Sequence, residues 1–208
     1  MNVQSVSMQA KNSRQQRAAV QRDHLVDTAL VLFAEQGYDA TSIKQIAVAA
    51  GVAVGLLYHY FPSKSEVLRA VWERHSFLPE LRTLLLVKHD QAATCVLEDV
   101  AESFSALLER KEALFRLMVR ESQSNPEVAA CLHSIVEEGI TALGAYLETR
   151  VQVGELRSHN ASLTARTLLG TVLTTHLARL PVRPWAELVA QLLHGISVHP
   201  VHVNSDQG

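Results

Sequence analysis

The sequence predicts an all-α protein, and three observations indicate this fold class. Gly and Pro together make up about 7% of the 208 residues, below the ~12% usual in globular domains. Aromatic residues are only 5% of the chain, which disfavours a β-sandwich. Apolar residues recur at the three- and four-residue spacing of amphipathic helices. With 48% apolar residues, the chain can bury a sizeable core.

Residues 1–20 are polar and rich in Gln, Ser and Arg, so we expect a flexible arm. The first 22 residues carry four basic side chains and no acidic one, although the whole chain has a net charge of −2. Residues 76–208 are acidic by comparison. The basic arm is suited to neutralising phosphates by counterion release. A solvated tail without a partner is the alternative.

A first helix is predicted from Arg22 to the stop at Gly37, which suits the position after a helix end. Its apolar face follows helical spacing: Leu25, Ala29, Leu32 and Phe33.

A second, short helix begins after Ser42, which forms a capping-box pattern with Gln45; Thr41 is the alternative cap. Its buried face is formed by four apolar residues: Ile43, Ile46, Ala47 and Ala50. Gly51 marks a tight turn.

A third helix over 54–60 ends before Pro62, and Ser63 caps a fourth helix from Lys64 to about Phe77. Two short helices joined by a glycine turn, at about 42–61, form the helix-turn-helix pattern.

The rest of the chain predicts longer helices, which brings the total to about nine. Their expected ranges are 91–110, 112–123, 126–153, 161–180 and 184–197. We therefore expect two domains, 21–75 and 76–199, followed by a disordered tail over 200–208. No secretory signal is evident, and the longest apolar run, Ile46–Tyr58, has 13 residues, fewer than the ~18 of a membrane span. These features favour a soluble, cytoplasmic protein.

The segment from Thr41 to Lys64 resembles the DNA-binding region of the tetracycline-repressor (TetR) family. The matching series is Phe33-Ala-Glu-x-Gly-Tyr38, then Thr41 to Ala47, Ala50-Gly-Val52 and Gly55-x-Leu-Tyr-x-Tyr-Phe-x-x-Lys64. A weaker similarity reaches the second half, where Gly154-Glu-Leu-Arg157 precedes Ala165-Arg166 and Leu168-Leu-Gly170.

The resemblance implies a helix that enters the major groove of double-stranded DNA. Thr41, Tyr58 and Lys64 would contact phosphates, and Gly55 would let the backbone come close. The full set of expected DNA-binding residues is Arg22, Thr41, Ser42, Lys44, Val54, Gly55, Leu56, Tyr58, His59 and Lys64. Solvated charge is the alternative for Lys44 and Lys64.

The third helix departs from the family pattern at its start. Ala53 and Val54 stand where a Ser and a polar or basic residue are common, and Leu56 stands where Thr is frequent. The helix therefore loses a side-chain N-cap, at a cost of about 1 kcal/mol. It also offers few hydrogen-bond donors to base edges, although Val54 and Leu56 suit contact with thymine methyl groups.

The resemblance also implies an effector pocket enclosed by the middle helices, and we expect a small, largely apolar effector. No cofactor or metal is expected, because the ten His residues show no ligand spacing. The expected lining residues are Phe104, Leu107, Leu108, Phe115, Met118, His133, Leu143 and Tyr146.

A homodimer is the third implication, with the last two helices forming a four-helix interface. A two-fold dimer would present two reading helices about 34 Å apart to a palindromic operator. The alternative is that these faces complete the core of each monomer. The expected interface residues are Leu169, Val172, Leu173, His176, Leu180, Leu188, Leu192 and Ile196.

The sequence therefore predicts a TetR-like transcriptional regulator, most simply a repressor that an effector releases from DNA. One alternative is a DNA-binding architectural protein without an effector. Another is a helical enzyme that uses His133 with Glu137 or Glu138, although no residue is arranged to orient a nucleophile.

Overall fold

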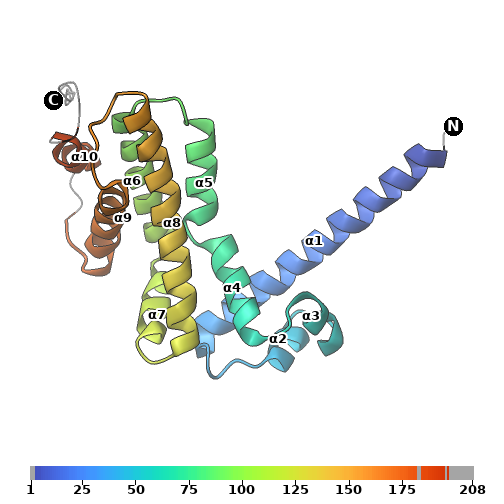
Figure 1. Ribbon diagram of the computed structural model, residues 1–208. Coiled ribbons are helices and arrows are strands. Elements are labelled where there is room, and N and C mark those ends of the chain that lie inside the picture. Colours follow the sequence, from blue (N-terminus) through green and yellow to red (C-terminus); the bar gives the residue numbers. More distant parts are fainter. Residues whose placement is uncertain (1–2, 182–183, 195, 197–208) are drawn as a thin grey trace. The chain divides into compact units, whose positions relative to one another are not determined.

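The computed structural model describes residues 3–181, 184–194 and 196, with side chains described from residue 15 onward except at position 113. The described residues form α-helices and no strand (Figure 1). The helices are α1 (Val3–Gln36), α2 (Ile43–Ala49), α3 (Val54–Tyr60), α4 (Lys64–His75), α5 (Leu78–Val87), α6 (Ala93–Arg110), α7 (Glu112–Ser122), α8 (Pro126–Gln152), α9 (Ala161–Leu177) and α10 (Trp185–His194). This confirms the all-α prediction.

Two elements differ from the sequence prediction. The expected arm is helical from Val3 onward, continuous with the rest of α1. No Gly or Pro interrupts this segment, so the helix extends toward the N-terminus. The additional helix α5, which raises the number to ten in the described part, was not predicted. Pro79 lies in its first turn, where proline is tolerated. The predicted tail over 200–208 lies outside the described residues.

The chain divides into two compact units. The first comprises the residues up to Arg74 together with Arg120–Cys131, which form the corner between α7 and α8. The sequence had assigned this corner to the second domain. The second unit comprises His75–Val119 and the chain from Leu132 onward. Its packing centres on α6, which lies against α5, α9 and α10.

The core of the first unit joins the helix faces that periodicity predicted. Leu25, Ala29 and Phe33 on α1 are at most 1% exposed, and Ile46 and Leu57 are fully buried. On α4, four side chains continue this core: Val67, Leu68, Val71 and Trp72. The short helices α2 and α3 therefore depend on tertiary packing, because helices of seven residues are marginal alone.

Among the described helices, α8 is long and apolar enough, by length and composition, to cross a membrane. Helices α2 and α3 reach the length of a membrane span only when they are counted together, and a sharp bend separates them. Core helices of globular proteins pass the same test. The middle of α8 carries Glu137 and Glu138, which form ion pairs with Arg166 and Arg82.

Candidate nucleic-acid interface

Helices α2 and α3 meet at an angle of 109°. This lies within the 90–120° range of helix-turn-helix units. Gly51 has a φ of +67°, which only glycine adopts at no cost, and the next amide, of Val52, donates to the Ala47 carbonyl at 2.9 Å. The turn is therefore fixed by backbone geometry, as the sequence predicted.

The two helix starts are capped differently. The Ser42 hydroxyl accepts a hydrogen bond from the backbone amide of Gln45 at 3.2 Å, and the side-chain oxygen of Gln45 accepts one from the backbone amide of Ser42 at 2.7 Å. This confirms the capping box and excludes Thr41 as the cap of α2. Ala53 precedes α3 and supplies no side-chain cap, as predicted.

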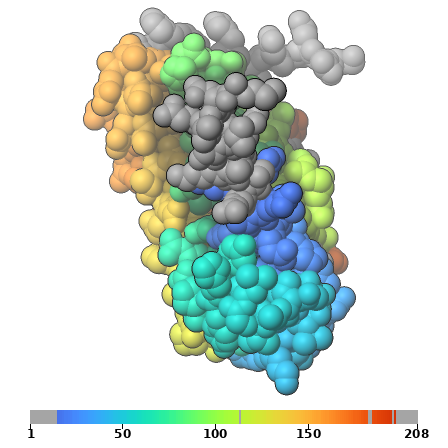
Figure 2. Space-filling view, turned by 90° about the vertical axis from the view of Figure 1, so that its right-hand side faces the viewer, coloured from blue at the N-terminus to red at the C-terminus, as the bar shows by residue number. Residues whose placement is uncertain are grey.

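Most of the expected DNA-binding side chains lie on one exposed surface of α2 and α3. In Figure 2, the cyan and teal atoms of this segment form a continuous surface. Tyr58 is 51% exposed and Leu56 37%, and Val54 is partly exposed. The other exposed members of the expected set are Ser42, Lys44, Gly55 and His59.

Gly55 occupies the second position of α3 without a structural need for glycine. Its φ lies outside the left-handed region, and a Cβ built there meets no atom of the described chain within 4 Å. A glycine inside a helix costs about 0.5–1 kcal/mol relative to alanine. The fold therefore gives no reason for this glycine, whereas the close approach of an external molecule would.

Three expected DNA-binding side chains, those of Thr41, Lys64 and Arg22, instead contact other groups of the protein. Thr41 is 2% exposed, and its hydroxyl donates to the Gly37 carbonyl at 2.7 Å. The Lys64 ammonium donates to the Tyr38 carbonyl at 3.0 Å and lies 4.1 Å from the Tyr38 ring centroid. The sequence shows that these groups are polar but not which way they point. In this geometry the Thr41 hydroxyl is not available to a phosphate, and Lys64 connects α4 to the loop before α2.

Arg22 is likewise engaged within the first unit. Its guanidinium lies 5.1 Å from the Phe61 ring centroid and 3.9 Å from the Glu73 carboxylate. The side chain remains 41% exposed, so part of the guanidinium still faces solvent.

The loop between α1 and α2 is bonded to the α7–α8 corner, a contact that the sequence did not reveal. The Tyr38 hydroxyl donates to Glu127 at 2.6 Å, and the Asn125 amide donates to Asp39 at 2.6 Å. Burial, together with the hydrogen bond to Glu127, raises the pKa of Tyr38 above its ordinary value. The hydroxyl is thus a permanent donor that stabilises the base of the helix-turn-helix unit.

All the expected effector-pocket residues lie in the second unit, and all but one of them are buried. Phe104 stacks on Phe77 with ring centroids 4.7 Å apart, and the Tyr146 hydroxyl donates to the Gln91 carbonyl at 2.8 Å. His133 is the exception, because its side chain is exposed. The buried members are Phe104, Leu107, Leu108, Phe115, Met118, Leu143 and Tyr146.

The residues proposed for a helical enzyme do not form a reactive group. Glu137 binds Arg166 at 2.9 Å, and Glu138 binds Arg82 at 2.8 Å, while His133 is exposed. Within the described part of the chain, no group of three or more His, Cys, Asp or Glu residues is placed to hold a metal ion.

The residues of the expected dimer face differ in their exposure on this single chain. Val172 is fully buried and belongs to the monomer core, whereas His176 is partly exposed and forms a 2.9 Å hydrogen bond with the buried Ser105 of α6. Leu180 is 55% exposed. The remaining members are partly exposed: Leu169, Leu173, Leu188, Leu192 and Ile196.

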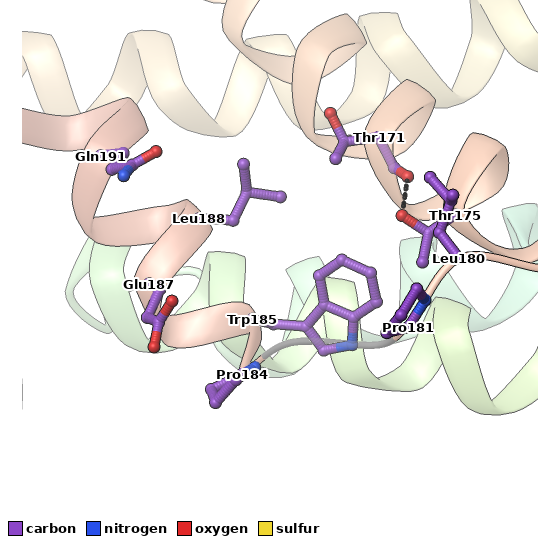
Figure 3. Close-up of a pocket in the computed structure, with 9 residues that line it drawn as sticks. All are labelled: Thr171, Thr175, Leu180, Pro181, Pro184, Trp185, Glu187, Leu188 and Gln191. Atoms are coloured by element: carbon purple, nitrogen blue, oxygen red, sulfur yellow. Dashed lines mark hydrogen bonds between the residues drawn. The ribbon is translucent and has the colours of Figure 1, made fainter.

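An open hollow of about 510 Å³ lies between the end of α9 and the start of α10. Figure 3 shows the Trp185 indole in its middle, between α10 and the Leu180–Pro181 end of the α9 segment. Its lining comprises Thr171, Thr175, Leu180, Pro181, Pro184, Trp185, Glu187, Leu188 and Gln191. Two expected interface residues, Leu180 and Leu188, are among the residues that line it.

A capped helix, a glycine turn and an exposed second helix at 109° define the helix-turn-helix class of proteins. Comparison with known proteins agrees: residues 25–71 match the model of bacterial regulatory proteins of the tetR family, and residues 95–190 match the C-terminal domain of AefR-like transcriptional repressors. Together these segments cover more than half of the chain. The chain belongs to the tetR family of bacterial regulatory proteins.

Individual relatives match over part of the chain. The transcriptional regulator AcrR of Shigella flexneri is 45% identical over 58 residues, which cover 28% of this chain and 27% of AcrR. The regulator BetI of Rhizobium meliloti is 34% identical over 111 residues, which cover 53% of this chain and 48% of BetI. The chain thus matches less than half the length of either relative.

The fold extends over most of the chain. The structure of SmeT in complex with triclosan has a TM-score of 0.69 and 24% identity, covering 89% of this chain and 96% of that one. SmeT is described as the repressor of the Stenotrophomonas maltophilia multidrug efflux pump SmeDEF.

Proposed function

We propose that this chain is a homodimeric transcriptional repressor that binds a palindromic operator through α2 and α3. The observation that carries the proposal is Gly55, which occupies an exposed helical position where the fold itself has no use for glycine. An approaching DNA backbone or base edge supplies the reason. The neighbouring exposed side chains of Lys44, Tyr58 and His59 are suited to phosphates and base edges.

Charge supports the same assignment. Residues 40–65 contain two lysines and no acidic residue. Because Lys64 is bonded to Tyr38, we assign phosphate contact to Lys44 and Tyr58, and additional contact to the basic N-terminal helix, where Arg17 is exposed.

The first experiment selects duplexes from a random-sequence library with the full-length protein and measures their affinity in gel-shift assays. We expect a palindromic consensus. Lys44→Ala should weaken binding to every sequence and reduce the slope of log K against log salt by about 2, because each subunit of the dimer loses one phosphate contact. Lys44→Arg keeps the charge and should keep the slope. If no sequence is enriched, the proposal is wrong.

We also propose a small, largely apolar effector for the second unit. The support is the shared burial of aromatic and aliphatic side chains on α6 and α7, with the Ser105–His176 hydrogen bond as a polar group in the same core. Triclosan, the ligand named with SmeT, is a suitable first probe. An effector must raise the melting temperature and release DNA, since the two ligands weaken each other's binding equally. A compound that stabilises the protein but leaves DNA affinity unchanged would not be an effector.

A cytoplasmic location and the absence of enzymatic activity belong to the same proposal. The ion pairs of Glu137 and Glu138 with arginines support a structural role for these carboxylates.

A further inference from the structure

The reading helix of this protein begins with an apolar surface. Val54 is partly exposed and Leu56 is 37% exposed, and they flank the exposed Gly55. None of the first four residues of α3 has a side-chain hydrogen-bond donor or acceptor. Tyr58 and His59, in the second turn, are the first polar side chains of the helix.

This composition restricts what the helix start can recognise. Hydrogen-bond readout of guanine, adenine or cytosine in the major groove needs polar side chains, which this turn lacks. The one apolar feature that distinguishes a base in the major groove is the 5-methyl group of thymine. The apolar surface lies in a stretch, 40–65, that contains no acidic residue. It therefore complements a major groove that carries thymine methyl groups better than a groove that lacks them.

Gly55 adds an independent reason for close contact. Because a Cβ at Gly55 would project into space that no atom of the described chain fills within 4 Å, its absence leaves a gap between Val54 and Leu56. A base pair can approach the helix there closely enough for both side chains to reach methyl groups.

We propose that Val54 and Leu56 determine operator specificity by packing against thymine 5-methyl groups. This inference rests on the proposed DNA binding by α2 and α3. Each half-site then contains thymines opposite the first turn of α3. Replacing such a thymine with deoxyuridine removes the methyl group and leaves the hydrogen-bonding edge unchanged.

The test uses the full-length protein and the consensus duplex selected from the random library. Each thymine is replaced in turn by deoxyuridine, symmetrically in both half-sites. At one or two positions we expect affinity to fall about fourfold for each methyl group lost, the factor of burying one such group. Elsewhere the replacement should have no effect.

Double-mutant cycles assign the methyl contact to a side chain. In Leu56→Ala or Val54→Ala, the deoxyuridine penalty should disappear at the position that the altered residue contacts. Leu86→Ala is the matched control, because Leu86 is 76% exposed on α5, outside the helix-turn-helix unit, and the penalty should remain.

The outcomes separate this inference from the proposed function. If the wild-type protein binds the selected duplex but every deoxyuridine duplex binds equally well, DNA binding stands and methyl recognition is refuted. If both α3 variants keep the full penalty, other groups read the methyls and the assignment is wrong. If the library yields no bound sequence, the proposed function and this inference both fail.

Discussion

The substitution Gly55→Ala separates what the fold needs from what DNA binding needs. The added Cβ meets open space on the described chain, so it brings no clash within the protein. Alanine is favoured over glycine in a helix by about 0.5–1 kcal/mol. At about 2–4 °C per kcal/mol for a chain of this size, the melting temperature should rise by about 1–4 °C.

The same methyl group should weaken operator binding. A methyl group inserted into a closely packed contact costs about 1–3 kcal/mol, which lowers affinity about fivefold or more. Differential scanning calorimetry measures the first effect, and fluorescence anisotropy with the selected operator measures the second. A more stable protein with weaker DNA binding is the expected combination.

Gly51→Ala is the control, because its expected effect on stability is opposite to that of Gly55→Ala. Gly51 has a φ of +67°, a conformation that costs an L-residue about 1–2 kcal/mol, so this variant should lose stability. Gly55→Ala that binds the operator as tightly as the wild type would refute the reasoning, because nothing would then approach Gly55. A lowered melting temperature would contradict its placement in an unstrained, open helix position.

Three further predictions concern the scaffold. Tyr38→Phe removes the hydrogen bond to Glu127, and a hydrogen bond to a charged partner contributes about 1.5–3 kcal/mol. The melting temperature should therefore fall by several degrees, and an unchanged melting temperature would mean that the bond contributes nothing. Ser42→Ala removes the capping box and should cost about 1 kcal/mol in urea unfolding, whereas Ser42→Asp should retain most of it. Burial raises the pKa of the Cys131 thiol to about 11, so little of it is thiolate at pH 8. Iodoacetamide should therefore modify the exposed Cys95 before Cys131, which peptide mass spectrometry can measure. Equal rates of modification would contradict the partial burial of Cys131.

The sequence predicted the helix-turn-helix unit well because its signals are local. The Ser42–Gln45 pair, Gly51 and the apolar spacing from Ile46 onward lie within a few residues of one another and determine caps, turn and buried face. The uncapped start of α3 at Ala53 followed in the same way. The family resemblance then supplied the functional interpretation.

The sequence did not predict features that depend on direction or on distant contacts. Thr41 and Lys64 are polar, but only the fold shows that both bind carbonyls of the loop before α2. The Tyr38–Glu127 bond joins residues 89 positions apart, which no local pattern indicates. The ring of His176 is bonded to Ser105 on another helix, 71 positions away, and no local pattern indicates this contact either.

We propose that the exposed surface of α2 and α3 recognises a specific palindromic operator. The most direct test is an anisotropy titration of the full-length protein, at 150 mM salt, against the selected duplex and against a duplex of the same composition with both half-sites scrambled. We expect the selected duplex to bind at least about a thousandfold more tightly, which is the lower limit for specific recognition. Equal affinity for the two duplexes would contradict it.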